Sequence, residues 1–157
     1  MSTLEQINSV FDLAIADFNA CEGMQRFWDK GLGLEHYASL MRQIFHHARE
    51  NPQIQAAATA FFRGRQREMV QPFLRHAVSE VGHDQLALND TAALGYDVSA
   101  IPMEQPLPAT TALVAFAYYQ IYNQTPVGYL GYLYYREFLH TTCGAQSMEV
   151  LVGLGVP

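Results

Sequence analysis

Cysteine is scarce in this sequence: Cys21 and Cys143 are the only two, and they lie far apart along the 157 residues. Two distant cysteines make neither a disulfide framework nor a metal-binding cysteine pair. We expect both to be free thiols in a reducing compartment, which predicts a cytoplasmic protein.

Basic runs are also missing. The sequence has 9 Lys and Arg against 15 Asp and Glu, which gives a formal net charge of -6. The densest basic stretch is the mixed segment 63–67, and the other cations are scattered. This distribution argues against nucleic-acid binding and favours a small-molecule partner.

The sequence offers neither an export signal nor a convincing membrane span. Residues 1–18 place Glu5, Asp12 and Asp17 among apolar residues and lack a cationic start. The weakly charged stretch 107–135 is interrupted by polar residues, proline and glycine, which indicates buried helices instead of a membrane segment. We therefore expect no membrane partner.

Apolar residues recur at helical spacing along most of the chain, and alternation typical of strands is not sustained. This pattern predicts an all-α protein, and its length and apolar content fit a single domain over 1–157. We expect an irregular, proline-rich linker at 96–108 and helices at 3–21, 34–50, 52–69, 72–94, 109–123 and 126–141, with a short last helix between 144 and 153. Pro72 either starts the fourth helix or kinks a longer one.

The first predicted helix has a recognisable start and end. Ser2 or Thr3 would cap it, and Gly23 would end it before a turn around Phe27 and Trp28. Its inner stripe is predicted to consist of Leu4, Ile7, Phe11, Leu13, Ile15 and Phe18.

The most informative stretch lies in the predicted helix 72–94. His76, Glu80 and His83 occupy positions i, i+4 and i+7, so they would share one helical face, and Asp90 would continue it. Such side chains are costly to bury on an apolar helix unless they are paired or coordinate a metal. We therefore regard this face as a candidate metal site.

A second Glu-x-x-His motif, Glu137 with His140, lies on another strongly apolar helix. Helical bundles build iron or manganese sites from inward-facing Glu and Glu-x-x-His pairs, and oxygen ligands with a few imidazoles suit iron(II) and manganese. One such motif alone arises easily by chance, whereas two in a small apolar chain strengthen the case for a metal site without excluding the alternative. The alternative is that His140 interacts with a helix C-terminus and Glu137 with Arg136.

The histidines of the helix 34–50 and the clustered tyrosines are more simply interpreted as structural residues. His46 and His47 are adjacent on the helix 34–50, so one of them must face away from the core. For His46 we favour a partly exposed position over a pocket-lining one. Seven of the 9 tyrosines lie between Tyr118 and Tyr135, a cluster typical of core and interface material.

The run from His76 through Glu80 and His83 to Asp84, followed by Leu86, Asp90 and Leu94-Gly95, resembles the hallmark helix of the heme-oxygenase-like di-iron oxidases. The relatives of that family include thiaminase-II-like and pyrroloquinoline-quinone-synthesis-protein-C-like proteins. The preceding helix, with Tyr37, Gln43 and His46, is similar to the corresponding helix of the superfamily.

The resemblance implies a heme-oxygenase-like bundle in which iron activates dioxygen to oxidise a small organic acid or amino acid. It implies Glu80, His83 and Glu137 as metal ligands and His76 as a further ligand or its partner, with no catalytic residue assigned. The family's last metal-binding helix has no counterpart before Pro157. We therefore expect at most about one iron ion per chain, with manganese as the alternative metal. A bundle without that helix would expose an apolar groove, so we also expect a homo-oligomer, such as a dimer, that covers it.

Three other readings compete with this one. A metal-free heme-oxygenase-like module could bind or dimerise without catalysis, with Glu80 and His83 as a hydrogen-bonded pair. Heme binding would need an axial histidine on the first helix, which has none. A ferritin-like di-metal bundle fits the two motifs, but no leading Glu for each motif is evident.

Overall fold

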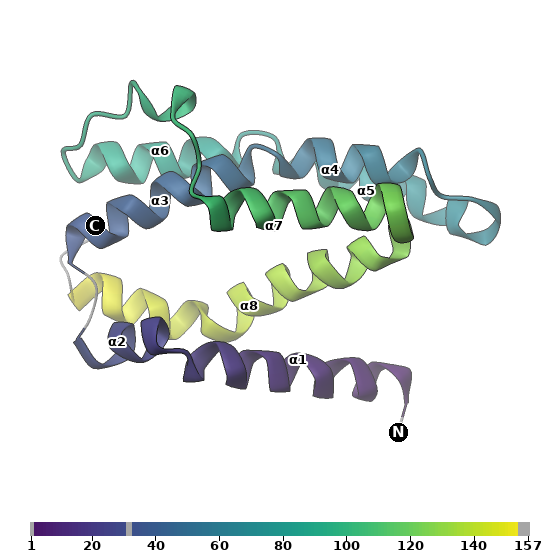
Figure 1. Cartoon of the computed structure of the whole chain (residues 1–157), viewed down its shortest axis with the longest axis horizontal. Coiled ribbons are helices and arrows are strands. Elements are labelled where there is room, and N and C mark those ends of the chain that lie inside the picture. Colours follow the sequence, from purple (N-terminus) through teal and green to yellow (C-terminus); the bar gives the residue numbers. More distant parts are fainter. Residues whose placement is uncertain (1, 31–32, 154–157) are drawn as a thin grey trace. The chain divides into compact units, whose positions relative to one another are not determined.

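The computed structural model describes residues 2–30 and 33–153 (Figure 1). The chain divides into two compact units, which are described separately below. The first unit draws on Met1–Leu34 and Tyr134–Pro157, and the second is Glu35–Leu133. The single-domain organisation stays a prediction.

Every regular element within the described ranges is helical, which confirms the all-α class. The first unit contains α1 (Thr3–Ala20) and α2 (Glu22–Lys30). The second unit contains α3 (Leu34–Ala48) apart from its first residue, α4 (Asn51–Thr59), the 3-10 helix η1 (Gly64–Met69) and α5 (Val70–Glu80). It also contains α6 (His83–Ala93), the 3-10 turn η2 (Ile101–Met103), α7 (Pro108–Tyr119) and the π-helical turn η3 (Gln120–Gln124). The last helix, α8 (Pro126–Gly153), contributes residues to both units. None of the helices in the described part of the chain combines the length and apolar character needed to cross a membrane.

In the first unit, α1 begins as the sequence predicts. The Ser2 side chain accepts from the Glu5 backbone N–H, and the Glu5 carboxylate accepts from the Ser2 backbone N–H, a reciprocal capping box. The predicted range 3–21 is confirmed to within one residue, since Cys21 adopts an extended conformation that ends α1. Gly23 is not the residue that ends it, because α2 already starts at Glu22. Phe27 therefore lies in a helix and not in a turn.

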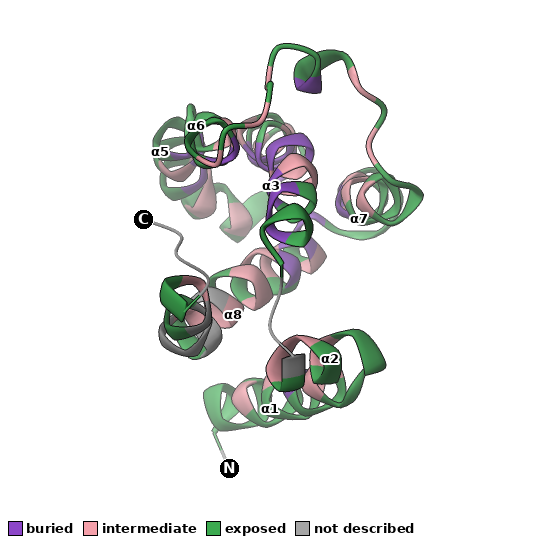
Figure 2. Ribbon diagram, turned by 90° about the vertical axis from the view of Figure 1, so that its left-hand side faces the viewer, coloured by how far each residue is buried: buried purple, intermediate pink, exposed green. Residues whose placement is uncertain are grey.

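The predicted apolar stripe of α1 is only partly correct. Phe11 packs against Tyr134 and Phe138 of α8, and Ile15 is buried. Leu4, Ile7 and Leu13 are exposed. Figure 2 shows exposed positions over much of α1 and α2 and many buried positions on α3.

The hydrophobic core lies in the second unit, where α4, α5, α7 and the first turns of α8 contribute to it. Its buried members are Ile54, Ala58, Phe62, Phe73, Ala117, Ile121, Tyr129 and Tyr132. The Phe62 and Phe73 rings meet edge to face with centroids 4.9 Å apart, and Phe73 meets Tyr129 at 6.1 Å. The tyrosine-rich segment is thus partly core material, as predicted, although Tyr119 and Tyr122 are exposed.

The predicted continuous helix 72–94 is wrong, because it breaks between α5 and α6. Val81 adopts an extended conformation, and Gly82 has a φ of 94°, in the left-handed region that favours glycine. Pro72 lies in the first turn of α5, one of the two predicted alternatives. Gly95, with a φ of 87°, follows the end of α6 as predicted.

Replacing Gly82 with alanine should lower the free energy of unfolding by about 1 kcal/mol, because an L-residue in this conformation is strained. Gly131→Ala is the matched control. Gly131 lies inside α8, and a Cβ there would meet no atom within 4 Å, so alanine should stabilise by about 0.5–1 kcal/mol. Urea denaturation would measure both changes. Equal effects of the two substitutions would contradict the claim that the backbone at position 82 requires glycine.

Three further boundaries differ from the predictions. The third helix ends at Thr59 instead of continuing to Met69, and η1 follows it. The helix predicted over 109–123 is α7 followed by η3. Gly144 does not separate two helices, because α8 is continuous over 28 residues. A single glycine inside a long helix is tolerated when the other positions favour helix.

Candidate metal centre

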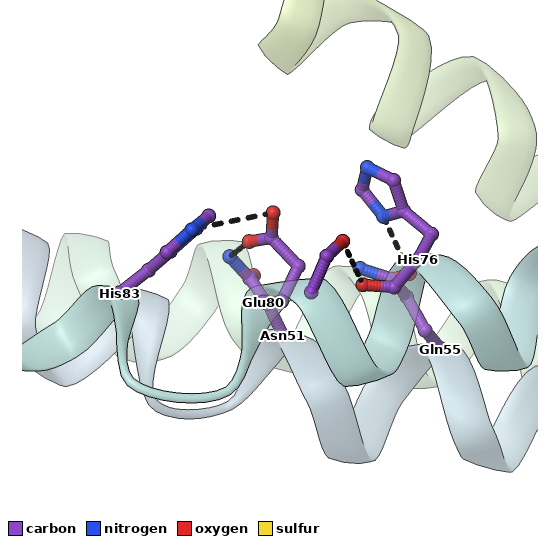
Figure 3. A network of polar contacts seen from close by, with 6 residues as sticks. Asn51, Gln55, His76, Glu80 and His83 are labelled. Carbon is purple, nitrogen blue, oxygen red and sulfur yellow. Dashed lines mark hydrogen bonds and ion pairs between the residues drawn. The ribbon is translucent and has the colours of Figure 1, made fainter.

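The candidate site is built on two packed helices of the second unit, α4 and α5. His76 and Glu80 lie one turn apart on α5, so their side chains project from the same face, as Figure 3 shows. A ring nitrogen of His76 and a carboxylate oxygen of Glu80 lie within 4.8 Å of each other. Two ligands of one ion are at most about 4.2 Å apart when each bond is about 2.1 Å. A small side-chain adjustment is enough to bring both to one ion.

Two amides on α4 face these side chains. Asn51 Nδ2 donates to Glu80 Oε2 at 3.2 Å, and His76 Nδ1 lies 2.7 Å from Gln55 Oε1. Asn51 and Gln55 are fully buried, and Glu80 is 9% exposed. A buried carboxylate is thus held by a hydrogen-bond donor from the neighbouring helix, as burial of a charged group requires.

His83 reaches Glu80 from the other side of the helix break. It is the first residue of α6, and its Nδ1 lies 3.2 Å from Glu80 Oε1. The expectation that His83 shares a continuous helical face with Glu80 is wrong, because the turn at Gly82 separates them. The two side chains nevertheless meet, and that of His83 is 50% exposed, which gives the site an open side.

Asp90 does not extend the cluster toward a metal. It lies on α6 and accepts a hydrogen bond from the Tyr37 hydroxyl at 2.9 Å. Burial, together with the Asp90 carboxylate, raises the pKa of Tyr37 to about 12. This pair connects α3 to α6 and is a structural contact of the second unit.

Glu137 and His140 belong to the first unit. Glu137 is an exposed residue of α8, and its approach to Glu80 stays a prediction. The side chains of His140 and Cys143 lie outside the described residues. Cys21 is a free, exposed thiol.

A separate cleft of about 590 Å³ lies between the end of α3, the proline-rich linker and α7. Its lining includes His46, Arg49, Glu50 and Tyr118 and none of the predicted metal ligands. Arg49 donates to the backbone carbonyl of Pro102 at 3.2 Å and so ties the linker to α3. Burial raises the pKa of Tyr118, and the nearby Glu50 carboxylate adds to the effect.

His46 is buried, so the favoured partly exposed reading is wrong and the pocket-lining alternative is correct. The other member of the pair, His47, is intermediate in exposure, and its Nε2 lies 2.6 Å from the Tyr132 hydroxyl. Among the described residues, His46 Nε2 finds no hydrogen-bond partner. Burial lowers the pKa of His46 below its ordinary value of 6.5, and the charge of Arg49 acts in the same direction.

Acidification should therefore weaken the fold through His46. The unfolded chain takes up a proton at this histidine near pH 6.5, above the folded-state pKa, so stability is retained above that pH and lost as pH falls. Urea denaturation at about pH 7.5 and 5.5 would measure the loss. It should become smaller in His46→Gln and stay unchanged in His36→Gln, which alters an exposed histidine of the same helix. An equal loss in His46→Gln and the unaltered protein would contradict this assignment.

The sequence reading missed Asn51 and Gln55. A usable signal was present, because Asn51, Ile54, Gln55 and Ala58 form the buried face of α4 at helical spacing. Two amides at i and i+4 on such a face need partners from a neighbouring element. Asn51 lies between the predicted helices 34–50 and 52–69, so the sequence pattern does not place it on a helical face.

No family model matches the sequence, and no curated protein matches it. Among solved structures, the chain is similar to a domain of unknown function with a heme oxygenase-like fold from Shewanella denitrificans OS217. The TM-score is 0.75 and the sequence identity 23%, and the match covers 96% of this chain and 69% of that chain. At this identity the similarity concerns the fold alone. The chain therefore has an all-α, heme oxygenase-like fold.

Proposed function

We propose that the protein is a non-heme iron-dependent oxidase or oxygenase that activates dioxygen to oxidise a small organic acid or an amino-acid-like substrate. The observation that carries the proposal is the meeting of one buried carboxylate, Glu80, with two imidazoles, His76 and His83. The heme oxygenase-like fold supports it. Glu137 is the proposed fourth ligand, and manganese is the alternative metal.

The residues present fit iron(II) by their chemistry. One carboxylate with two imidazoles is the ligand set of many mononuclear iron(II) oxygenases, in which the metal reduces dioxygen while open positions admit it and the substrate. Glu80 supplies the charge that attracts a cation. His83, half-exposed, lies on the side from which solutes can enter.

The protein's own residues prepare this site in three ways. Asn51 holds one oxygen of Glu80, and Gln55 holds the ring of His76. Burial of Glu80 limits competition from water for its oxygens, which strengthens its interaction with a cation. The start of α6, just after the turn at Gly82, places His83 beside the other oxygen of Glu80.

Anaerobic titration of metal-free protein with iron(II) tests the proposal. We expect at most about one ion per chain, because the proposed ligands suffice for one centre and a di-iron centre needs about six. The titration should be repeated with manganese(II). Saturation near zero for both metals would refute the proposal, and two tightly held irons would require ligands that we have not assigned.

The second candidate is a metal-free binding or dimerisation module. Both oxygens of Glu80 already have protein partners, Asn51 and His83, so this carboxylate is satisfied without a metal. Exposed apolar residues on α1, namely Leu4, Ile7, Val10 and Leu13, support a homo-oligomer under either candidate. A dimer in sedimentation, together with no metal uptake, would favour the module.

A further inference from the structure

The two amides of α4 match the two predicted ligands of α5 one for one. Asn51 and Gln55 are four residues apart, as are His76 and Glu80, and the helices pack against each other. Asn51 contacts Glu80 and Gln55 contacts His76 (Figure 3). We call Asn51 and Gln55 the amide pair.

The Asn51 contact has a defined direction. An ionised carboxylate only accepts hydrogen bonds, so the Asn51 atom that faces Glu80 must be the Nδ2 donor. Asn51 Oδ1 then points elsewhere and finds no partner among the described residues. A buried amide that leaves one atom unpaired incurs a free-energy cost of about 1–3 kcal/mol. The fold retains this orientation, which keeps a donor on Glu80.

The Gln55 contact specifies the proton of His76. With Gln55 Oε1 facing the ring, His76 donates from Nδ1, and its Nε2 keeps the lone pair. Gln55 Nε2 is left buried without a partner in the described part of the chain. Metal-binding histidines commonly donate their other ring N–H to a carbonyl or carboxylate, which fixes both tautomer and ring direction.

From this geometry we infer that the amide pair consists of positioning residues for a metal centre: Asn51 fixes the carboxylate of Glu80, and Gln55 holds His76 as the Nδ1–H tautomer with Nε2 free to bind an ion. The metal-binding part of the inference rests on the proposed function. The tautomer of His76 does not, since the hydrogen bond is a property of the metal-free protein.

The tautomer is measured first, by nitrogen-15 NMR of the metal-free protein labelled at histidine, with His76→Gln to assign the signal. We expect His76 to carry its proton on Nδ1. Gln55→Met, which keeps the size but removes the acceptor, should shift it toward the Nε2–H tautomer. Gln55→Glu restores an acceptor oxygen and should keep Nδ1–H. An Nε2–H tautomer in the unaltered protein, or no change in folded Gln55→Met, would overturn the inference.

Iron(II) affinity is measured next on the same proteins. Gln55→Met and Asn51→Leu should each weaken binding about 10–100-fold, the usual effect of losing an outer hydrogen bond of a metal ligand, whereas Gln55→Glu should stay within about threefold. Thr91→Val is the matched control: Thr91 is fully buried, but its hydroxyl donates to the Ala87 carbonyl of its own helix. It should leave affinity unchanged.

The tautomer measurement and the iron(II) titration test the orientation of His76 and the metal-binding role separately. If the unaltered protein takes up no iron, the proposed function fails, while the tautomer result still decides whether the amide pair orients these side chains. If iron binds but Gln55→Met changes affinity no more than Thr91→Val does, the amide pair does not position the ligands. Circular dichroism confirms that each variant is folded, and Gln55→Glu provides a second test if Gln55→Met is not.

Discussion

Replacing Glu80 with glutamine should abolish measurable iron(II) binding. The substitution keeps the shape of the side chain and removes its charge, so a cation would lose the anionic oxygen that anchors it between His76 and His83. Losing the carboxylate of a two-histidine, one-carboxylate set leaves too few ligands to hold a labile ion. Anaerobic titration followed by metal analysis of desalted protein would measure the loss.

Asp84→Asn is the matched control for this substitution. Asp84 lies next to His83, and its carboxylate accepts from the Gln85 side chain outside the Glu80 cluster. Asp84→Asn removes one negative charge, as Glu80→Gln does, only a few residues away. It therefore tests the general electrostatic attraction of iron(II) separately from its coordination by Glu80. Iron uptake should remain within about twofold of the unaltered protein, since long-range charge effects are screened by salt. Equal losses in both variants would indicate non-specific attraction of cations.

Replacing Phe62 with alanine should lower the free energy of unfolding by about 3–5 kcal/mol, the range for deleting a buried aromatic side chain. Phe62 is 1% exposed, and its ring packs edge to face against Phe73 in the core of the second unit. The deletion removes that contact and leaves a cavity. Urea denaturation followed by circular dichroism would measure the change.

The neighbouring Phe61 supplies the control. It is 36% exposed and contacts the ring of Tyr122, which is itself largely exposed. Phe61→Ala should therefore lower the free energy of unfolding by about 1 kcal/mol. If the two substitutions were equally destabilising, Phe62 would not be a core residue of the second unit as the structure shows it.

The general fold could be predicted from the sequence because helical periodicity and helix ends are local features. Ser2 and Glu5 cap α1 as expected, since the motif depends on residues close in sequence. Gly82 was more ambiguous, because one glycine in a helical pattern either is tolerated or ends the helix. Its φ of 94° shows that here the glycine ends the helix, which spacing alone does not reveal.

The site could be predicted less completely. The spacing of His76 and Glu80 placed them on one face of α5, and the structure retains this arrangement. Asn51 and Gln55 become visible as parts of the site only when α4 packs beside α5, because their partners lie more than 20 residues away. The contribution of Glu137 depends on the arrangement of the two units and stays a prediction.

The central claim is that His76, Glu80 and His83 hold iron, and anomalous diffraction tests it most directly. Crystals grown anaerobically with iron(II) should be measured on both sides of the iron absorption edge. We expect one anomalous peak per chain within about 2.3 Å of a Glu80 oxygen and a His76 nitrogen, the length of a metal–ligand bond. A peak elsewhere, or none at this cluster in crystals containing iron, would contradict the account.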